Sequence, residues 1–394
     1  MSHLWLPFTQ MLEFPPRARC FVRGEGTMLE DRSGKRVYDA VSSIWTTIHG
    51  HGHPRIVEAI ARQAARLDHA TLLGASNPVA EELAERLCAL AGMDRAFFAS
   101  DGASAIEAAL KMALQYWQNV GKSERRRFVR LAGAYHGDTV GAMSVSDIAV
   151  FKSRFGAVTF ETRAYDDGTS LESDVAAVIV EPLVQAAAGM RLVPPEAYRS
   201  LRKCDALVIC DEIATGFGRT GTMFAFGQAD LDPDIVCVGK GLTGGTLALS
   251  ATLVGQTLYD AFLGAPEEQL HFFHGHSYAG NPIACAAALA SLALFDEEKT
   301  LEHAAAIAAA AEPRLAELRA HPLVSDARQC GTMIGVELTE PRGWEVADAL
   351  YERGHFTRPI GNVIQFVPPL SSTKEEVNAF FDDLTAESAL RVTA

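Results

Sequence analysis

The stretch A-L-V-I-C-D-E-I-A-T-G-F-G-R-T-G, from Ala206 to Gly221, is the starting point for interpreting the chain. It begins with an apolar run typical of a buried strand, and this run ends at Asp211 and Glu212, just before a glycine-rich loop. Carboxylates are rarely buried alone, because removing an unpaired charge from water is costly. The pattern therefore predicts a core strand whose carboxyl end meets a cation.

Similar apolar runs recur along the chain and alternate with helical patterns. Strands are predicted at 95–99, 128–131, 176–180, 206–210, 235–238 and 247–254, and helices at 54–67, 78–91 and 105–120. This alternation favours crossover connections between parallel strands, with helices covering both faces of the sheet. We therefore predict an α/β fold with a mostly parallel sheet flanked by helices.

The two ends of the chain differ from this middle part. After residue 280 the pattern is helical, and later it gives short strand-like pieces such as T-M-I-G-V-E-L and V-I-Q-F-V. We predict a large α/β domain over residues 51–295. A smaller, discontinuous α+β domain is expected to combine residues 1–50 with residues 296–394.

The composition argues against several classes of function. The net charge of −14 gives no electrostatic support for binding nucleic acid or an anionic membrane. No apolar run approaches the roughly 20 residues that span a bilayer, and the N-terminal residues do not resemble a signal peptide. The seven cysteines are scattered, as is typical of reduced thiols. We expect a soluble cytoplasmic protein.

Lys240 follows another predicted strand, I-V-C-V-G-K-G, and opens a glycine-rich turn. Ligands of open parallel sheets bind beyond the carboxyl ends of the strands, so Lys240 and Asp211 are expected to face one crevice. They could form a structural ion pair. Alternatively, Lys240 could form a Schiff base with pyridoxal phosphate, whose pyridine nitrogen needs a carboxylate such as Asp211 beside it.

Three further stretches have a functional and a structural interpretation. In F-F-A-S-D-G-A-S-A-I-E, a helix start could seat a phosphate, or Ser104 could simply cap the helix. Tyr135, in A-Y-H-G-D-T, could stack on a planar cofactor or merely pack. The run H-G-H-G-H, from His49 to His53, resembles a metal cluster, but the alternating glycines favour a loop. No metal site is predicted.

Taken together, these stretches resemble the class III aminotransferases, which share the fold-type I pyridoxal-phosphate architecture. The resemblance rests first on V-I-C-D-E-I-A-T-G-F-G-R-T-G and D-P-D-I-V-C-V-G-K-G-L-T-G-G. It extends to W-L-P-F-T-Q-M, S-S-I-W-T-T-I-H-G-H-G-H-P, Y-H-G-D-T-V-G-A-M-S-V, E-P-L-V-Q-A-A-A-G-M and G-N-P-I-A-C-A-A-A-L-A-S-L. These motifs are most similar to the branch that aminates 8-amino-7-oxononanoate in biotin synthesis. They cover the chain from about Leu4 to Pro369.

The resemblance implies roles for individual residues around the cofactor. Lys240 would be the catalytic Schiff-base lysine, Asp211 would pair with the pyridine nitrogen, and Tyr135 would stack near the ring. The remaining cofactor-binding positions are Gly102, Ala103, Ser104, His276 and Ser277. Because Ser277 matches a residue that reaches the phosphate of the neighbouring subunit, the resemblance also implies a homodimer with active sites at the interface.

The resemblance also implies a substrate pocket. Arg358 matches the arginine that binds the carboxylate of the oxononanoate. The other matching positions are Phe8, Ile44, Trp45, Tyr135, Asp138, Arg219 and Gly275. Gln185 is followed by A-A-A-G, so the glutamate gate of glutamate-using relatives is missing. This implies S-adenosylmethionine or lysine as the amino donor.

Four positions depart from the pattern of that branch. Phe8 lacks the phenolic hydroxyl usual at its position, and Ile44, Ile360 and Gln365 stand where aromatic residues are common. The departures fit a retained substrate, but they equally fit an omega-amine transaminase of another pathway acting on a different amino or oxo acid. An aminomutase and a non-catalytic cofactor-binding protein are further alternatives.

Overall fold

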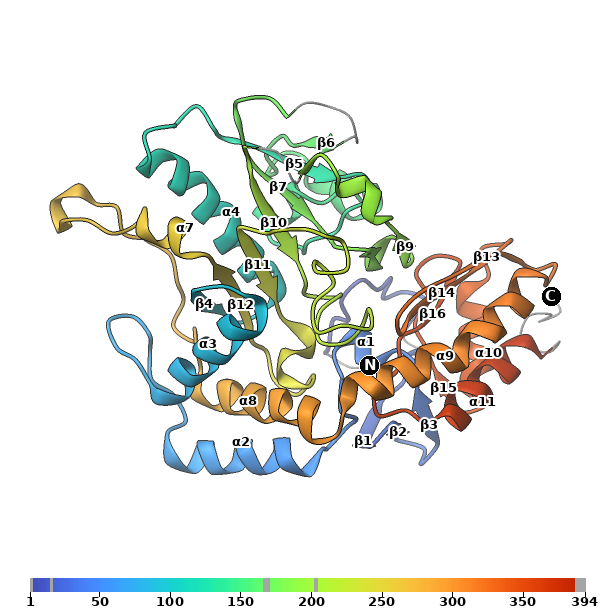
Figure 1. Cartoon of the computed structure of the whole chain (residues 1–394). Coiled ribbons are helices and arrows are strands. Elements are labelled where there is room, and N and C mark those ends of the chain that lie inside the picture. Colours follow the sequence, from blue (N-terminus) through green and yellow to red (C-terminus); the bar gives the residue numbers. More distant parts are fainter. Residues whose placement is uncertain (1–2, 15–16, 166–170, 202–204, 387–394) are drawn as a thin grey trace.

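The computed structural model describes residues 3–14, 17–165, 171–201 and 205–386. The chain forms a larger part around a seven-stranded sheet and a smaller part near both ends of the chain (Figure 1). Helices α8 (Pro282–Glu297) and α9 (Thr300–Arg319) follow one another and lead from the larger part into the smaller one.

The seven-stranded sheet has the strand order β4-β12-β11-β10-β7-β5-β6. Its members are β4 (Arg95–Ala99), β12 (Ser250–Val254), β11 (Ile235–Val238), β10 (Leu207–Asp211), β7 (Val175–Val180), β5 (Arg127–Leu131) and β6 (Arg163–Tyr165). The strands from β11 to β6 are parallel, whereas β12 runs antiparallel to both of its neighbours. The predicted mostly parallel sheet is confirmed, and β6 is an edge strand that the pattern did not predict.

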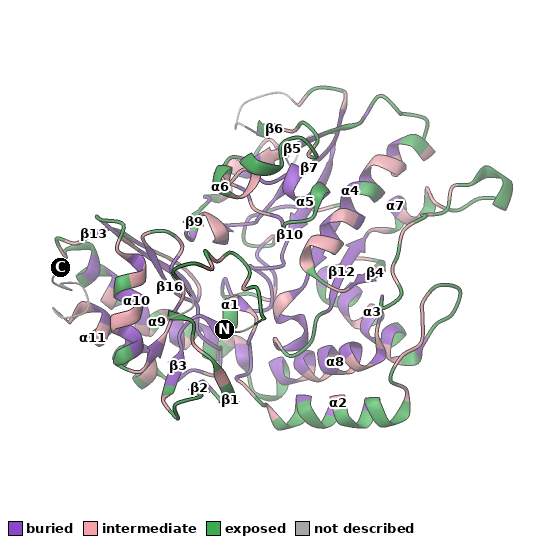
Figure 2. Cartoon of the chain, turned by 180° about the vertical axis from the view of Figure 1, so that it is seen from behind, coloured by how far each residue is buried: buried purple, intermediate pink, exposed green. Residues whose placement is uncertain are grey.

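The side chains of β10 alternate between the two faces of this sheet. Leu207 and Ile209 belong to the apolar cluster under α4 (Gly102–Asn119), whereas Val208 and Cys210 belong to a cluster on the opposite face. Helices α3 (Pro78–Ala91) and α8 pack on that opposite face beside β4, β11 and β12. Figure 2 shows buried strands between partly exposed helices. Because both faces are covered, the strands have continuous apolar sequences.

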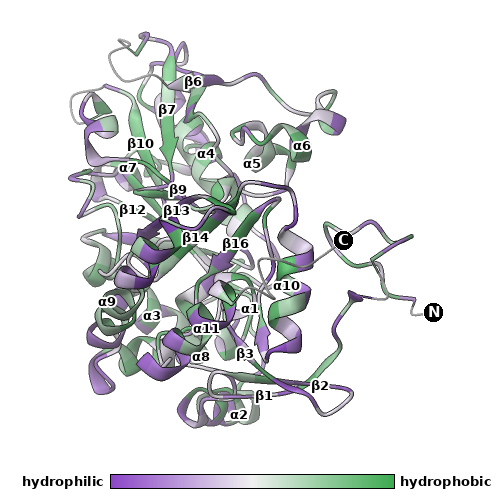
Figure 3. Cartoon of the chain, turned by 90° about the vertical axis from the view of Figure 1, so that its right-hand side faces the viewer, coloured by the Kyte–Doolittle hydropathy of each residue, from purple (hydrophilic) through white to green (hydrophobic). Residues whose placement is uncertain are grey.

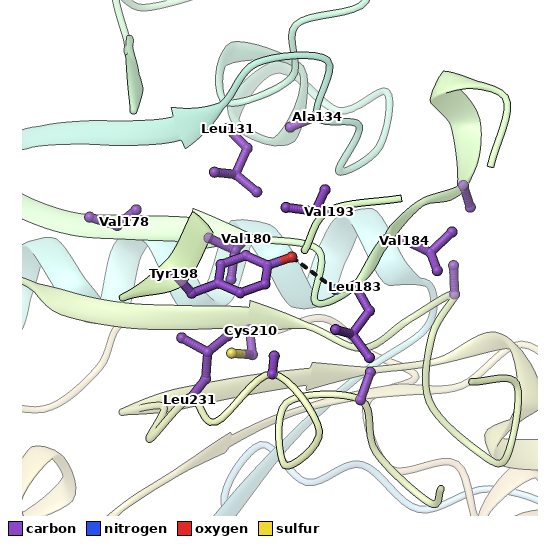
Figure 4. Close-up of a cluster of buried hydrophobic side chains, with 14 of the residues drawn as sticks. Leu131, Ala134, Val178, Val180, Leu183, Val184, Val193, Tyr198, Cys210 and Leu231 are labelled. Carbon is purple, nitrogen blue, oxygen red and sulfur yellow. Dashed lines mark hydrogen bonds between the residues drawn. The ribbon is translucent and has the colours of Figure 1, made fainter. Parts of the chain in front are cut away.

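The cluster beside β7 and β10 also fixes the turn that follows β7. Tyr198 lies in this cluster near Val180 and Cys210 (Figure 4). Its hydroxyl accepts a hydrogen bond from the backbone N–H of Leu183 (2.9 Å) and donates one to the carbonyl of Glu181 (3.1 Å). Tyr198 therefore holds Glu181 in place at the carboxyl end of the sheet.

Two predicted element boundaries are wrong by a few residues. Strand β12 begins later than predicted, because Thr243 Oγ1 donates to the carbonyl of Leu247 (2.7 Å) and accepts from its N–H (3.2 Å). Helix α4 begins earlier than predicted, because the carboxylate of Asp101 accepts the N–H of Ser104 (3.0 Å) and caps the helix. Local side-chain bonds therefore set both boundaries.

The smaller part contains two further sheets, one of which joins distant segments of the chain. The first sheet has β1 (Phe21–Glu25), β2 (Met28–Asp31), β3 (Arg36–Asp39) and β15 (His355–Phe356), and the second has β13 (Val324–Cys330), β14 (Met333–Leu338) and β16 (Val363–Phe366). Strand β15 pairs in parallel with β3. The domain boundaries at residues 50 and 295 stay a proposal.

Amphipathic helices cover the smaller part. Besides α9 these are α10 (Gly343–Glu352) and α11 (Lys374–Thr385). In α11, Val377, Phe380, Phe381 and Leu384 are buried, and Figure 3 shows polar and apolar residues on the same helices. This spacing places one apolar stripe of α11 against the core.

The remaining elements are short or lie at the periphery. They are α1 (Ser42–Trp45), α2 (Pro54–Arg66), α5 (Val140–Ser144), α6 (Ala149–Lys152), α7 (Gln256–Asp260), β8 (Val184–Gln185), β9 (Arg191–Leu192), and the 3-10 turns η2 (Ser153–Phe155), η3 (Ala186–Ala188), η4 (Pro195–Tyr198), η6 (Lys240–Thr243) and η7 (Pro266–Glu268). Within the described residues, no helix is long and apolar enough to cross a membrane. Cys204 lies outside the described residues, and the other six cysteines are free thiols.

Candidate active site

A cavity of about 490 Å³ lies at the carboxyl ends of three neighbouring strands. Glu181 follows β7, Asp211 ends β10, and Lys240 follows β11 after one glycine. The cavity, called the lysine cavity below, is lined by Trp45, Asp101, Gly102, Ala103, Tyr135, His136, Gly137, Asp138, Thr139, Glu181, Asp211, Ile213, Ala214 and Lys240. The predicted meeting of Asp211 and Lys240 in one crevice is therefore observed.

Asp211 is held by partners other than the lysine. Its Oδ2 lies 2.7 Å from Nδ1 of His136, and its Oδ1 accepts the N–H of Ile213 (3.0 Å). Within the described residues, Asp211 contacts the His136 ring and forms no ion pair with Lys240. The structural ion pair between Asp211 and Lys240 is therefore not formed, and both groups face the cavity.

Lys240 has the surroundings expected of a reactive amine. Burial lowers the pKa of its ammonium group, while the carboxylates of Asp211 and Glu181 act in the opposite direction. Its Nζ lies over the ring of Trp45, 5.3 Å from the centroid. Lys240 also has a φ of 41°, a strained value for a residue with a side chain. The lowered pKa favours the neutral, nucleophilic amine.

Glu181 and His136 line the cavity, although sequence reasoning gave neither a role. Glu181 Oε2 accepts the backbone N–H of Tyr135 (3.0 Å), and burial with the nearby Asp211 charge raises the pKa of Glu181 well above its usual range. The two signals that could have found them were the strand end V-I-V-E-P and the histidine in A-Y-H-G-D-T.

Tyr135 and Asp138 both line the lysine cavity. The phenol donates a hydrogen bond to Asp138 Oδ2 (2.8 Å). Burial and this hydrogen bond raise the pKa of the phenol. The Tyr135 ring contacts Phe151 edge-on, with centroids 5.8 Å apart. The stacking of Tyr135 on a cofactor stays a prediction.

The start of α4 brings Gly102 and Ala103 to the cavity, and their contact with a phosphate stays a prediction. A side chain at Gly102 would collide with Ile213, whose Cγ2 would lie 2.9 Å from an added Cβ. Ser104 does not line the cavity, because its N–H and hydroxyl both bond to Asp101. The alternative that Ser104 caps the helix is wrong, since Asp101 is the capping residue, and a contact of Ser104 with the phosphate stays a prediction.

A second cavity of about 560 Å³ contains Phe8 and Arg358. This arginine cavity is lined by Leu6, Pro7, Phe8, Thr9, Gln10, Glu13, Phe14, Arg17, Ala18, Arg19, Phe21, Trp344, Ala347, Asp348, Tyr351, Phe356, Thr357 and Arg358. Phe8 contacts Phe151 edge-on at 5.1 Å, and Phe151 in turn contacts Tyr135 of the lysine cavity. Sequence reasoning placed Phe8, Arg358 and Trp45 in one pocket, whereas the structure divides them between two cavities.

Trp45 is the predicted substrate residue that reaches the lysine cavity from the small-domain side. Its indole N–H donates to Gln365 Oε1 (2.8 Å). Ile44 and Ile360 are partly buried and pack against the core cluster beside β7 and β10. These two departures from the family pattern therefore contribute to packing in this chain.

Four other predicted residues lie outside both cavities. Arg219 is buried, and its guanidinium donates to the carbonyls of Pro368 and Thr47, so it fastens loops together. The remaining three are Gly275, His276 and Ser277. The His276 ring accepts the N–H of Tyr278 at Nδ1 (3.2 Å), and its Nε2 lies 3.4 Å from Ser100 Oγ. Their contact with a neighbouring subunit stays a prediction.

The three histidines of H-G-H-G-H bond to three different partners. His49 Nε2 lies 3.2 Å from Ser291 Oγ, His51 bonds to Asp39 (2.9 Å), and His53 bonds to Glu298 (3.0 Å). The predicted loop is confirmed. The described part of the chain contains no group of three His, Cys, Asp or Glu that could hold a metal ion.

Comparison with known families identifies this arrangement. The family model for class III aminotransferases matches residues 13–387. The chain belongs to the class III aminotransferase family. It is 39% identical to the adenosylmethionine-8-amino-7-oxononanoate aminotransferase of Aquifex aeolicus, over 97% of this chain and 94% of that protein. It is 41% identical to the Geobacter sulfurreducens protein of the same name, over 97% and 94%.

Solved structures agree with the assignment of the chain to the class III aminotransferases. The crystal structure of the Methanocaldococcus jannaschii adenosylmethionine-8-amino-7-oxononanoate aminotransferase has a TM-score of 0.93 at 37% identity, covering 99% of this chain and 97% of that one. An amine transaminase from an uncultivated Pseudomonas species, in its pyridoxal-phosphate-bound form, has a TM-score of 0.93 at 31% identity, covering 100% and 99%. The fold is therefore that of the fold-type I transaminases.

Class III aminotransferases use pyridoxal phosphate, and the lysine cavity fits this cofactor. Lys240 offers an amine with a lowered pKa, Asp211 offers a carboxylate for the pyridine nitrogen, and α4 offers its N-terminus for the phosphate. When bound, the cofactor withdraws electrons from the carbon that carries the amine. The chain is thus a pyridoxal-phosphate-dependent aminotransferase.

Proposed function

We propose that the enzyme transfers an amino group from S-adenosylmethionine, or from lysine, to the ketone of 8-amino-7-oxononanoate. The product would be 7,8-diaminononanoate, an intermediate of biotin biosynthesis. Relatives about 40% identical over nearly the whole chain carry the name of this activity. The observation that carries the proposal is the pair of cavities, because an acceptor with a distant carboxylate needs a cation away from the reacting carbon.

Lys240 would move the proton in each half of the reaction. With its amine free and neutral, Lys240 would take a proton from the substrate carbon that carries the transferred nitrogen. It would then return the proton to the carbon on the other side of that nitrogen. Asp211 would keep the pyridine nitrogen protonated, and His136 would hold the Asp211 carboxylate in position through the 2.7 Å contact. The ring of Trp45 beside Lys240 Nζ would exclude water from the amine.

Arg358 would bind the carboxylate of the acceptor and so select which carbon is aminated. A guanidinium can hold a carboxylate by two parallel hydrogen bonds, which fixes both distance and orientation. Burial lowers the pKa of Arg358, in keeping with a cation that waits for an anionic partner inside a cavity. Phe8 supplies an apolar wall on the same side.

The proposal includes a homodimer in the cytoplasm. Gly275, His276 and Ser277 lie outside the lysine cavity of their own chain, which agrees with a contribution to the site of a neighbouring subunit. The same segment exposes Phe273 and Tyr278, which are 70% and 65% accessible. A second copy covering these rings would remove a large apolar surface from water.

An omega-amine transaminase of another pathway is the second candidate. It is favoured by the departure at Phe8, which lines the arginine cavity, and by the similarity to the Pseudomonas amine transaminase. A phenylalanine at this position lacks the phenolic hydroxyl usual there, which makes the wall of the cavity less polar. Such a pocket could accept a different amino or oxo acid.

The test is direct formation of product. The holoenzyme is incubated with 8-amino-7-oxononanoate and, in turn, S-adenosylmethionine, lysine, alanine and simple amines, and 7,8-diaminononanoate is measured by mass spectrometry. The proposal expects product with S-adenosylmethionine or lysine. If the aminated enzyme instead transfers nitrogen only to other oxo acids, the biotin function is wrong. If no free oxo product leaves the donor, an aminomutase is favoured.

A further inference from the structure

The side chain of Gln365 connects the two cavities. Gln365 lies in β16, is 1% exposed, and makes two hydrogen bonds through its amide. Its Oε1 accepts from the indole N–H of Trp45 (2.8 Å), and its Nε2 donates to the carbonyl of Arg358. Because an indole N–H can only donate and a carbonyl can only accept, the two partners allow a single orientation of the amide.

The backbone at Trp45 is strained. The four residues from Ser42 to Trp45 have φ values of 50°, 48°, 66° and 68°, all in the left-handed region. Side chains disfavour this region, so the turn must be held by contacts from outside. Two such contacts come from the chain just after β16: Ser42 Oγ donates to the carbonyl of Val367 (2.7 Å), and the N–H of Val367 donates to Ala40 (2.8 Å).

The backbone bonds fix the turn, and the indole ring packs in the apolar cluster beside β7 and β10, so the N–H is the part of the ring that needs a polar partner. Its N–H is buried with Gln365 as its hydrogen-bond partner, and a buried donor without a partner is costly. The same ring lies 5.3 Å from the amine of Lys240. The ring orientation therefore links the amide of Gln365 to the catalytic amine.

We propose that Gln365 is a positioning residue that fixes Trp45 beside Lys240 and ties the segment bearing Arg358 to it. One amide thereby sets the distance between the lysine cavity and the arginine cavity. A phenylalanine ring at position 365 could neither accept from the indole nor donate to the Arg358 carbonyl. This inference deepens the proposed function and rests on it only for the role of Arg358.

The test compares two glutamines of the same sheet. Gln365→Met removes both amide bonds at nearly constant side-chain volume. Gln329→Met is the matched control, because the Gln329 amide in β13 also makes two hydrogen bonds, to the carbonyls of Ala308 and Gly331. Gln329 lies outside the lysine and arginine cavities. Each holoenzyme is examined by the visible circular-dichroism band of bound pyridoxal phosphate and by steady-state kinetics.

Gln365→Met is expected to change the circular-dichroism band and to raise KM for the acceptor about tenfold, with a smaller change in kcat. Trp45→Phe alone should reproduce the change in the band, and adding Gln365→Met to it should change the band no further. Gln329→Met should resemble the wild type in both measurements.

Two results would overturn the proposal. One is a Gln365→Met enzyme with the band and KM of the Gln329→Met control. The other is a change in the band that persists at full size in the Trp45→Phe background. Because the band is measured without substrate, failure of 8-amino-7-oxononanoate as acceptor would refute the proposed function and leave this part of the test valid.

Discussion

The lysine cavity and the arginine cavity are joined through Gln365 and yet are built in different ways. The lysine cavity is formed mainly by the ends of β7, β10 and β11 and by the start of α4, which belong to the large sheet and its helix layer, and is completed by Trp45 and residues 135–139. The arginine cavity is formed by residues within 6–14 and 17–21, which contain little regular structure, and within 344–358.

This difference separates the chemistry from the choice of substrate. Catalytic groups need fixed distances, which strands held on both sides supply. Residues that select a substrate can lie on loops, where substitutions disturb the core little. In this chain the departures at Phe8 and Gln365 lie at or beside the arginine cavity, while Asp211 and Lys240 match the family. The comparison implies that mutations in the two cavities will have different kinetic signatures.

The largest effect is expected from removing the amine of the lysine cavity. Lys240→Ala should lower the rate of both half-reactions by about 10³-fold or more, because no second lysine lines the cavity to take its place. The rates are measured by stopped-flow absorbance with donor and acceptor separately. Lys35→Ala, which removes a lysine paired with Glu352, is the control and should behave as the wild type. Retained turnover in Lys240→Ala would refute the whole assignment.

A smaller but still large effect is expected at Asp211. Asp211→Asn removes the charge that would keep the cofactor's pyridine nitrogen protonated, and both half-reactions should slow by about 10²-fold. Asp234→Asn is a control at the opposite end of the sheet, where Asp234 accepts the N–H of Val208 (2.8 Å). Equal loss in the two variants would mean that Asp211 acts through stability alone.

The pH dependence of cofactor capture tests the electrostatics of the lysine cavity. Since burial lowers the pKa of Lys240, the neutral amine should become the major form at a lower pH than for a free lysine side chain. The rate at which the apoenzyme captures pyridoxal phosphate should therefore rise with pH and level off below the usual lysine range. If the capture rate reaches half its maximum at the pH expected for a free lysine side chain, the cavity does not lower the pKa of this amine.

The smallest expected effect concerns Glu212, which neighbours Asp211 but lies outside both cavities. Burial raises the pKa of Glu212 from 4.5 to about 7, while its carboxylate accepts from Thr215 and from the N–H of Phe226. Between pH 4.5 and about pH 7, Glu212 is deprotonated in the unfolded chain but still protonated in the folded protein. The free energy of unfolding should therefore fall as pH rises through this window, by on the order of 3 kcal/mol.

Glu212→Gln should remove that slope and leave activity nearly unchanged. The measurement is urea unfolding between about pH 4.5 and pH 7. A pH slope identical to that of the wild type would show that Glu212 stays ionised in the folded protein. Asp211→Asn is expected to lower activity, whereas Glu212→Gln is expected to change only the pH dependence of stability. Comparing the two variants therefore distinguishes a catalytic carboxylate from one that stabilises the loop.

The sequence predicted the lysine cavity better than the arginine cavity, for a physical reason. Apolar strands that end in Glu181, Asp211 and Lys240 are local patterns, and parallel pairing brings their ends together. The residues from distant loops follow no such rule. Arg219 was expected in the substrate pocket, but it is buried against two carbonyls that no sequence pattern connects to it.

The contacts of Gln365 were equally hidden in the sequence. They arise because β16 and the left-handed turn at Trp45 meet only in the folded protein, 320 residues apart along the chain. The positions around Ser277 illustrate another limit, because a single chain does not contain the neighbouring subunit that they are predicted to contact. Local periodicity predicts elements and strand ends, whereas contacts between loops depend on the whole fold.

The most direct test of the two-cavity account is the pair of half-reactions in Arg358→Leu. If the arginine cavity holds only the acceptor's carboxylate, the donor half-reaction should stay within about twofold of the wild type, while the apparent affinity for 8-amino-7-oxononanoate falls about 30-fold or more. Arg353→Leu, which removes an arginine paired with Asp383, is the matched control. Equal losses in the donor and acceptor half-reactions would contradict the account.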